Sequence, residues 1–308
     1  MSQTQVFTGD RKNGLISFSL WAHSGSAGRR VNLFLLMMPL KTRSFALAAL
    51  LLISLTMPIQ LIKAIPSYGQ VVYYNFESIS GVDVSDLSGN GKTAQLVGNV
   101  TVEDGKDGKA VRLTGVNDCV LLPQGILNNI TNFTLSTWVN LSSTATWSRI
   151  FDFGSGTDEY MFLTPMSGNG TPRFAIKPFT GGEQIIDANV NIPTNTWTHV
   201  AITFTWDTNL KQGVGKFYIN GEQVGINQSI TVSPAMLAST TQNYLGKSQW
   251  PDPGLNGLID EFVLYYRPLS ETEIMECYGF TAEMVAAYNS LTLTGDLTNV
   301  TDNLTLPT

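Results

Sequence analysis

Between Tyr68 and Ser270 the chain alternates short runs of β-branched and aromatic residues with Gly, Asn, Asp and Pro, and no long helical period interrupts them. Short runs punctuated by turn residues are typical of antiparallel all-β domains. Asn220 and Gly221 lie between FYI and EQV, and both accept a positive φ, which predicts a tight hairpin. The pattern predicts one two-sheet antiparallel sandwich of about two hundred residues, large enough to bury its own core.

The segment Gly257–Ile274, GLIDEFVLYYRPLSETEI, predicts a strand, a turn and the start of a helix. Period-two alternation places four residues of this strand on one face: Leu258, Asp260, Phe262 and Leu264. That face is predicted to be the core side. Ser270 and Glu273 have the spacing of a capping box, in which each side chain satisfies a free backbone N–H at the helix start.

Six segments, taken in order, resemble the motifs of the laminin G-like, concanavalin A-like jelly-roll family. They are Tyr73–Gly98, Gly108–Pro123, Phe133–Leu141, Thr196–Phe204, Gly215–Gly225 and Gly257–Ile274. The resemblance implies a jelly-roll domain over residues 68–278. It also implies a module that mostly binds or packs, since a fold of this kind does not fix a reaction.

The charge balance limits the partners. The formal net charge is −6 and the sequence pI is about 4.9, and the basic residues are scattered through the expected sandwich. Electrostatic binding to a nucleic-acid backbone is therefore not expected. The sandwich sequence also has no zinc-type Cys/His cluster and no glycine-rich phosphate cradle.

Residues 38–64 have the pattern of a signal peptide or a membrane anchor. Lys41 and Arg43 precede an apolar run at residues 44–62, and Ala64 is a suitable last residue before cleavage. Left uncleaved, the run is near the minimum length for a membrane span. Residues 1–37 fit neither pattern and are interpreted as a doubtful leader before a start at Met38. The protein is expected to be secreted or at the cell surface, with membrane contact only through an uncleaved N-terminal segment.

If the protein is exported, its two cysteines can be oxidised, because a disulfide is permitted in an oxidising compartment. The resemblance allows the strand with Cys119 and the helix with Cys277 to lie close together, so a disulfide between them is one hypothesis. The alternative is two separate, buried, reduced thiols.

The C-terminal residues 279–308 predict a short linker and a truncated second module. Thr294–Thr308 resembles the first strands of the atrophied bacterial Ig-like domain, which links modules in exported bacterial glycoside hydrolases. The resemblance implies a fragment of a longer protein that is covalently linked to a catalytic module. The alternative is an ordinary polar tail.

No catalytic site is expected in this chain. Glucanases of the jelly-roll family carry an acid and a nucleophile on alternate residues of one strand, so that both face the sugar. Asp260 and Glu261 are consecutive and therefore point to opposite faces. His199, the only histidine of the expected sandwich, occupies a position that the family often fills with histidine for packing or hydrogen bonding.

The resemblance also implies one structural Ca²⁺, with Asp260 and Glu77 as candidate ligands and backbone carbonyls completing the shell. Glu77 has the wrong strand parity, because Val72, Tyr74 and Phe76 are expected to face inward. It contributes only if the strand bends there. The alternative is that Asp260 caps backbone N–H groups without a metal.

Three aromatic residues in expected loops, Trp147, Tyr160 and Trp250, are candidate platforms for weak binding of a polysaccharide or other glycan. The alternative is that they pack against the sandwich edge. The favoured hypothesis is a noncatalytic carbohydrate-associated module, glycan-binding or spacer, of an exported multidomain glycoside hydrolase. A cell-surface adhesion or structural interaction module is the second hypothesis.

Overall fold

The computed structural model describes residues 7–12, 15–22, 29–36, 65–280 and 284–285. The chain divides into two compact units, one of Ile62–Thr281 and one of Met1–Leu61 with Ala282–Thr308. The candidate signal or anchor at 38–64 and the Ig-like motif at 294–308 lie outside the described residues. None of the helices in the described ranges is long and apolar enough to cross a membrane.

The second unit contributes a small antiparallel sheet in the order β1-β2-β3. Its strands are β1 (Phe7–Lys12), β2 (Leu15–Ala22) and β3 (Arg29–Leu36).

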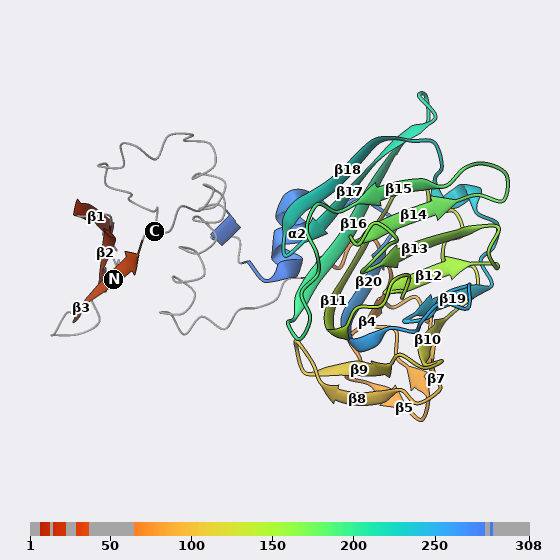
Figure 1. Cartoon of the computed structure of the whole chain (residues 1–308), viewed down its shortest axis with the longest axis horizontal. Helices are drawn as coiled ribbons and strands as arrows, with labels where there is room; N and C mark the ends of the chain where they lie inside the picture. Colours follow the sequence, from red (N-terminus) through yellow and green to blue (C-terminus); the bar gives the residue numbers. More distant parts are fainter. Residues whose placement is uncertain (1–6, 13–14, 23–28, 37–64, 281–283, 286–308) are drawn as a thin grey trace. The chain divides into compact units, whose positions relative to one another are not determined.

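The unit Ile62–Thr281 is built from two antiparallel sheets stacked face to face, as Figure 1 shows. The strands of the first sheet are β5 (Ile79–Ser80), β6 (Asp83–Val84), β7 (Ala94–Val97), β10 (Cys119–Leu122), β12 (Phe151–Gly154), β13 (Tyr160–Thr164), β14 (Arg173–Lys177), β15 (Gln184–Asp187) and β19 (Gln242–Leu245). These nine strands lie in the order β15-β14-β13-β12-β19-β10-β7-β6-β5. The long-range pairing of β12 with β19 brings together segments that lie far apart in the sequence.

The strands of the second sheet are β4 (Gln70–Tyr74), β8 (Thr101–Asp104), β9 (Lys109–Thr114), β11 (Phe133–Ser143), β16 (Thr198–Asp207), β17 (Gln212–Ile219), β18 (Glu222–Ile230) and β20 (Asn256–Tyr265). They lie in the order β18-β17-β16-β11-β20-β9-β8, and β4 pairs with β20. A short 3₁₀ helix, η1 (Pro234–Met236), and one α-helix, α2 (Glu271–Tyr278), complete the described part of this unit. The expected all-β, two-sheet sandwich is confirmed.

The core lies between the sheets and is filled by alternate residues of the facing strands. Ring contacts join the two layers directly. The ring centroids of Phe133 (β11) and Phe174 (β14) are 5.9 Å apart, and those of Phe153 (β12) and Phe262 (β20) are 6.3 Å apart. Each fully buried phenylalanine contributes on the order of 2 kcal/mol through removal of apolar surface from water.

A β-bulge in β20 changes the expected face assignment. Glu261 has a φ of 53°, and the pairing with β11 shifts register where Ser136 faces Val263 and Trp138 faces Asp260. Before the bulge Ile259 faces the core, and after it Phe262 and Leu264 do. The predicted face shared by Leu258, Asp260, Phe262 and Leu264 is therefore wrong. Asp260 lies on the outer side with Trp138, because the extra residue inverts the alternation.

Helix α2 covers the outer face of the second sheet. It contributes Ile274 and Cys277 to a separate apolar cluster with Val263 and Tyr265 of β20. The expected capping box is present: Ser270 Oγ accepts the N–H of Glu273 at 3.2 Å, and Glu273 Oε2 accepts the N–H of Ser270 at 2.8 Å. The helix ends at Gly279, whose φ of 112° only glycine adopts readily.

The hairpin of β17 and β18 turns as expected at Asn220 and Gly221, whose φ values are 52° and 82°. Two consecutive left-handed residues define a type I′ turn.

Cys119 and Cys277 are not bonded to each other, which corrects the disulfide hypothesis. Cys119 begins β10 and faces away from the core, since Val120 and Leu122 face into it. Cys277 lies under α2 on the outer side of the other sheet. Both sheets separate the two thiols, so the Cα separation that a disulfide requires is not available.

Candidate functional site

The outward face of the nine-stranded sheet carries an aromatic cluster that is separate from the core. On β13, Met161 and Leu163 face the core, so Tyr160 and Phe162 face outward. Ala175 of β14 lies beside Phe162 in the pairing of these strands and leaves room for the rings. Trp147, from the loop before β12, and Trp250, from the loop after β19, pack onto this surface and stay half-buried. Two loops about a hundred residues apart in sequence therefore meet over one sheet face.

The rings meet mostly edge to face. The ring centroids of Trp250 and Tyr160 are 4.8 Å apart at an interplanar angle of 78°, and those of Trp147 and Phe162 are 6.5 Å apart at 87°. Such contacts add on the order of 1 kcal/mol per pair beyond the area that they bury. Each indole is thus fixed by a neighbour's ring while part of its own surface remains exposed.

One guanidinium lies under the whole cluster. Arg149 Cζ is 4.1 Å from the Phe162 ring centroid, 5.5 Å from that of Trp250 and 5.8 Å from that of Trp147. The residue is only 2 % exposed. A cation over aromatic faces is favourable, and more so away from water, so Arg149 orders the three rings around itself.

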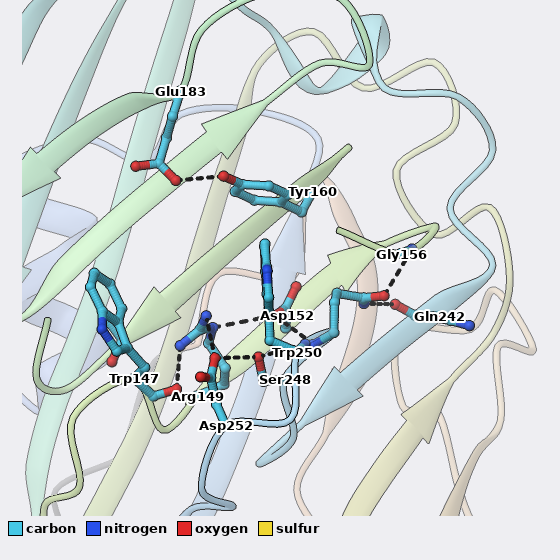
Figure 2. A network of polar contacts seen from close by, with 12 residues as sticks. Trp147, Arg149, Asp152, Gly156, Tyr160, Glu183, Gln242, Ser248, Trp250 and Asp252 are labelled. Carbon is cyan, nitrogen blue, oxygen red and sulfur yellow. Dashed lines mark hydrogen bonds and ion pairs between the residues drawn. The ribbon is translucent and has the colours of Figure 1, made fainter. Parts of the chain in front are cut away.

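Figure 2 shows how the Arg149 charge is balanced. Its Nε donates to Asp152 Oδ2 at 3.2 Å, its Nη2 donates to Asp252 Oδ2 at 3.1 Å, and its Nη1 donates to the Trp147 carbonyl. The Gln249 N–H also donates to Asp152 Oδ2, at 3.1 Å, which ties the β19–β20 loop to β12. Breaking one partner of such a buried pair costs several kcal/mol, because the other charge is left buried.

Ser248 extends the same network toward Trp250. Its hydroxyl donates to Asp252 Oδ2 at 2.9 Å and accepts the Trp250 N–H at 3.1 Å. The backbone that carries the second indole is therefore fixed by the carboxylate that neutralises Arg149.

Burial is the largest influence on the pKa values of Arg149 and Asp152. It raises the pKa of Asp152 to about 7, although the attraction of Arg149 and the hydrogen bond from Gln249 act in the opposite direction. Burial likewise lowers the pKa of Arg149, against the attraction of Asp152 and Asp252. Although general acids also have raised pKa values, Asp152 is 0 % exposed and no substrate can reach its carboxyl group.

Trp147 has an unusual backbone for a bulky residue, with a φ of 66°. Its N–H donates to the Met166 carbonyl at 2.8 Å, and Ser148 N–H donates to the Ala145 carbonyl at 3.1 Å, so a tight turn holds this conformation. Residues held in the left-handed region concentrate at functional sites, where the surrounding structure maintains the strain.

The three aromatic residues that the sequence analysis proposed as platforms, Trp147, Tyr160 and Trp250, lie in one cluster, but Tyr160 differs from expectation. Tyr160 lies in strand β13 rather than in a loop and is only 6 % exposed. Its hydroxyl donates to Glu183 Oε2 at 2.6 Å, and burial, followed by that hydrogen bond, raises the pKa of Tyr160. Tyr160 therefore supports the edge of Trp250 and offers little surface of its own.

Arg149 and Phe162 were not singled out from the sequence. The signal for Arg149 is a lone basic residue beside apolar strand positions in WSRIFDFG, at Trp147–Gly154, where a buried cation requires carboxylate partners. The partners Asp152 and Asp252 are visible in the sequence, but their convergence depends on the pairing of β12 with β19.

The two candidate calcium ligands both contact the segment between β8 and the start of β9. Asp260 Oδ2 accepts the N–H groups of Lys106 and Asp107 at 2.8 and 3.0 Å. Glu77 Oε1 accepts the Lys109 N–H. The bend that Glu77 requires is present, because Phe76 has a φ of 60°.

The loop encloses these carboxylates closely. A Cβ atom on Gly105 would lie 2.7 Å from Asp260 Oδ2, and one on Gly108 would collide with the Glu77 carboxylate. In the described part of the chain no group of three or more His, Cys, Asp and Glu side chains is arranged to hold a metal ion. The two candidate ligands thus supply two carboxylates, and other oxygen atoms, among them peptide oxygens of the loop, would have to supply the rest of a calcium shell.

His199 lies beneath α2 and is 1 % exposed. Its Nε2 is 2.8 Å from Ser136 Oγ, and its ring packs against Trp138 at 5.4 Å and Tyr278 at 6.2 Å. The neighbouring cavity of about 10 Å³ holds one water molecule at most. The pair therefore has no access for a substrate, and the histidine packs and hydrogen-bonds inside the fold.

Comparison with known families agrees with this architecture. The profile of the concanavalin A-like lectin/glucanases superfamily matches residues 114–275, more than half of the 308-residue chain. The chain belongs to this superfamily. No curated protein sequence matches it.

Solved structures include several of the same jelly-roll fold. Domain 4 of a GH43 extracellular arabinanase from Geobacillus stearothermophilus, solved in complex with arabinotriose, is 25% identical, with a TM-score of 0.56. The match covers 68% of this chain and 98% of that domain.

More distant structures share the fold alone. The binding domain of Paraclostridial Mosquitocidal Protein 1 is 18% identical with a TM-score of 0.52, and the match covers 69% of this chain and 52% of that one. Trypanosoma rangeli sialidase with the inhibitor DANA is 15% identical with a TM-score of 0.53, over 90% of this chain and 44% of that one. The superfamily member described here thus spans about half of these two proteins.

Proposed function

We propose that the sandwich is a noncatalytic glycan-binding module that holds a neutral polysaccharide on the outward face of its nine-stranded sheet. The observation that carries the proposal is the pair of half-buried indoles, Trp147 and Trp250, fixed around the buried Arg149. Indole faces stack on the apolar faces of sugar rings. The similar domain of the arabinanase was solved with arabinotriose, which makes a pentose oligosaccharide the first ligand to test.

The charges around the cluster favour a neutral ligand. Arg149 is paired with Asp152 and Asp252, and Arg173 forms a two-point pair with Asp187 at 2.6 and 2.9 Å. Neither guanidinium can take a sugar carboxylate without breaking an existing pair, and for the buried Arg149–Asp152 pair that is costly.

The biological setting proposed is an exported multidomain glycoside hydrolase, in which this module is linked to a catalytic module encoded elsewhere in the full protein. The basic and apolar pattern of residues 38–64 and the likeness to a domain of an extracellular arabinanase support this setting.

The test is affinity electrophoresis of the purified chain in gels with arabinan, xylan, galactan or β-glucan. Stacking contributes on the order of 1 kcal/mol per indole, so affinities near millimolar and retardation by at least one polysaccharide are expected. Trp250→Ala should weaken binding by about five- to tenfold, and it should also lower Tm because the indole packs on Tyr160 and Arg149, so binding is compared at a temperature where both proteins are folded. Tyr68→Ala removes an aromatic side chain that is 71% exposed elsewhere on the domain and is the matched control.

The chain should release no reducing sugar from the same polysaccharides. Turnover that survives removal of contaminants would contradict a noncatalytic role. Binding to none of a broad glycan panel would instead favour the adhesion or structural interaction module.

A further inference from the structure

A polar groove lies where the ends of β9, β11 and β20 meet the two loops that carry Trp147 and Trp250. Its volume is about 210 Å³, and it is bounded by the β9–β10 turn, the β11–β12 loop and the β19–β20 loop. Ser143, the last residue of β11, and Ala145 in the loop that follows line the groove, and the same loop carries Trp147. The β19–β20 loop supplies Pro253 and Gly254, and also carries Trp250.

Residues of the groove and of the aromatic cluster are close neighbours along both loops. Ala145 and Trp147 are two residues apart, so their Cα atoms are within about 7 Å. The carbonyl of Ala145 accepts both the N–H and the hydroxyl of Ser148, at 3.1 and 2.9 Å, which folds this segment into one tight turn. On the other loop, Pro253 directly follows Asp252, the partner of Arg149. The Arg149–Asp252 pair therefore fixes the groove and the indoles in one frame.

A directed chain of hydrogen bonds ends at the groove. Arg112 Nη2 donates to Asn256 Oδ1 at 3.0 Å, and Asn256 Nδ2 donates to Ser143 Oγ at 3.1 Å. Each donor polarises the next one, and because the Ser143 oxygen accepts in this series, its hydroxyl hydrogen remains available to donate. Ser143 is exposed and lines the groove, so that acceptor can be a ligand oxygen.

We propose that this groove is a second subsite, which binds the hydroxyl and ring oxygens of the next residue of the same neutral glycan chain. The inference rests on the proposed glycan-binding function and extends it from one stacking platform to a linear, multi-residue site. Ser143 and Asn256 recognise sugar oxygens, while Trp147 and Trp250 stack on the preceding ring. The module consequently selects oligosaccharides over monosaccharides.

Calorimetric titration of the purified full chain with L-arabinose and with arabinotriose tests this inference. The wild-type chain should bind the trisaccharide about tenfold more tightly than the monosaccharide, the gain expected from one or two added hydrogen bonds. Ala145→Phe fills the groove, and Ser143→Ala removes the terminal hydroxyl with minimal change to the fold. Both variants should keep the wild-type affinity for arabinose and lose most of the trisaccharide advantage. Leu210→Phe introduces the same phenylalanine side chain at a site 73% exposed and outside the groove, and should leave both affinities unchanged.

The outcomes separate the two proposals. If the wild-type chain binds both sugars equally, or if the groove variants keep the full trisaccharide advantage, the second subsite is overturned while the stacking platform stands. If the wild-type chain binds neither sugar nor any polysaccharide of the panel, the proposed function fails and the subsite fails with it.

Discussion

At the scale of single residues, Trp147 shows how the fold maintains a strained conformation to present a side chain. Its φ of 66° lies in the left-handed region, which costs a non-glycine residue on the order of 1 kcal/mol. The Met166 carbonyl fixes its N–H and Arg149 fixes its carbonyl, so the turn cannot relax without losing both bonds.

A comparison of two substitutions at this position tests the strain directly. Trp147→Ala and Trp147→Gly both remove the indole, but only glycine adopts the left-handed backbone without cost. Trp147→Gly should therefore be more stable than Trp147→Ala by about 1 kcal/mol in urea denaturation, whereas both lose glycan binding equally. A more stable alanine variant would contradict the left-handed turn.

The buried Asp152 predicts a pH dependence of unusual sign for a carboxylate. Burial raises its pKa to about 7 in the folded state, so folding takes up a proton. The corresponding stability is fully present below about pH 4, the unfolded pKa, and is lost as the pH rises to about 7. Denaturation of the wild-type chain from pH 4 to 8 should show this decline, and Asp152→Asn should remove it.

Glu273 provides the internal contrast. Its hydrogen bond to Arg267 lowers the pKa of Glu273 to about 2, so its contribution is lost only as the pH falls from about 4.5 toward 2. The two windows overlap only between about pH 4 and 4.5. An Asp152→Asn variant that keeps the wild-type slope between pH 4 and 7 would contradict the assignment to Asp152.

At the scale of elements, features set by neighbouring residues could be predicted from the sequence, whereas features set by the pairing of distant strands could not. The Asn220–Gly221 hairpin and the Ser270 capping box follow from residues within four positions of one another, and both are confirmed. The bulge at Glu261 depends on how β20 pairs with β11, more than a hundred residues away, so strict alternation gave the wrong face for Asp260. The meeting of Trp147 and Trp250 likewise required the order β13-β12-β19, which no single segment encodes.

The β8–β9 loop carries the proposal of a structural calcium ion. Asp260 and Glu77 would bind the ion together with peptide oxygens of the loop, since Ca²⁺ is a hard cation that takes carboxylate and carbonyl oxygens as ligands. A ligand bound only by the folded state raises Tm, so chelation of calcium-saturated protein should lower Tm, and added calcium should restore it.

Asp260→Ala distinguishes the effect of the metal from that of the hydrogen bonds. This variant loses the two bonds to Lys106 and Asp107 and should be destabilised by a few kcal/mol with or without calcium. If Asp260 binds calcium, the Tm of the variant should in addition no longer respond to chelator. Identical melting curves of fully loaded wild-type protein with and without chelator would exclude the calcium proposal and leave Asp260 as a cap of backbone N–H groups.

At the scale of the whole molecule, the aromatic cluster and α2 lie on opposite outer sides of the sandwich. The outward side of the nine-stranded sheet presents the half-buried indoles, the groove lies at strand ends of the eight-stranded sheet and the loops that follow them, and α2 packs against the outer side of that second sheet.

The start of the folded domain is compatible with removal of the N-terminal segment. Ile65 packs against the apolar cluster of α2, and the Pro66 carbonyl accepts a hydrogen bond from the Gln70 side chain at 3.0 Å. Cleavage after Ala64, the site proposed from the sequence, would leave these contacts with the mature domain. Expressed from Met38 in a bacterial host, the protein should therefore appear outside the cytoplasm, and N-terminal sequencing should begin at Ile65. Lys41→Glu combined with Arg43→Glu should slow export, because a positively charged start precedes the apolar run of a signal peptide. A full-length species retained in the membrane fraction would show instead that residues 44–62 serve as an uncleaved anchor.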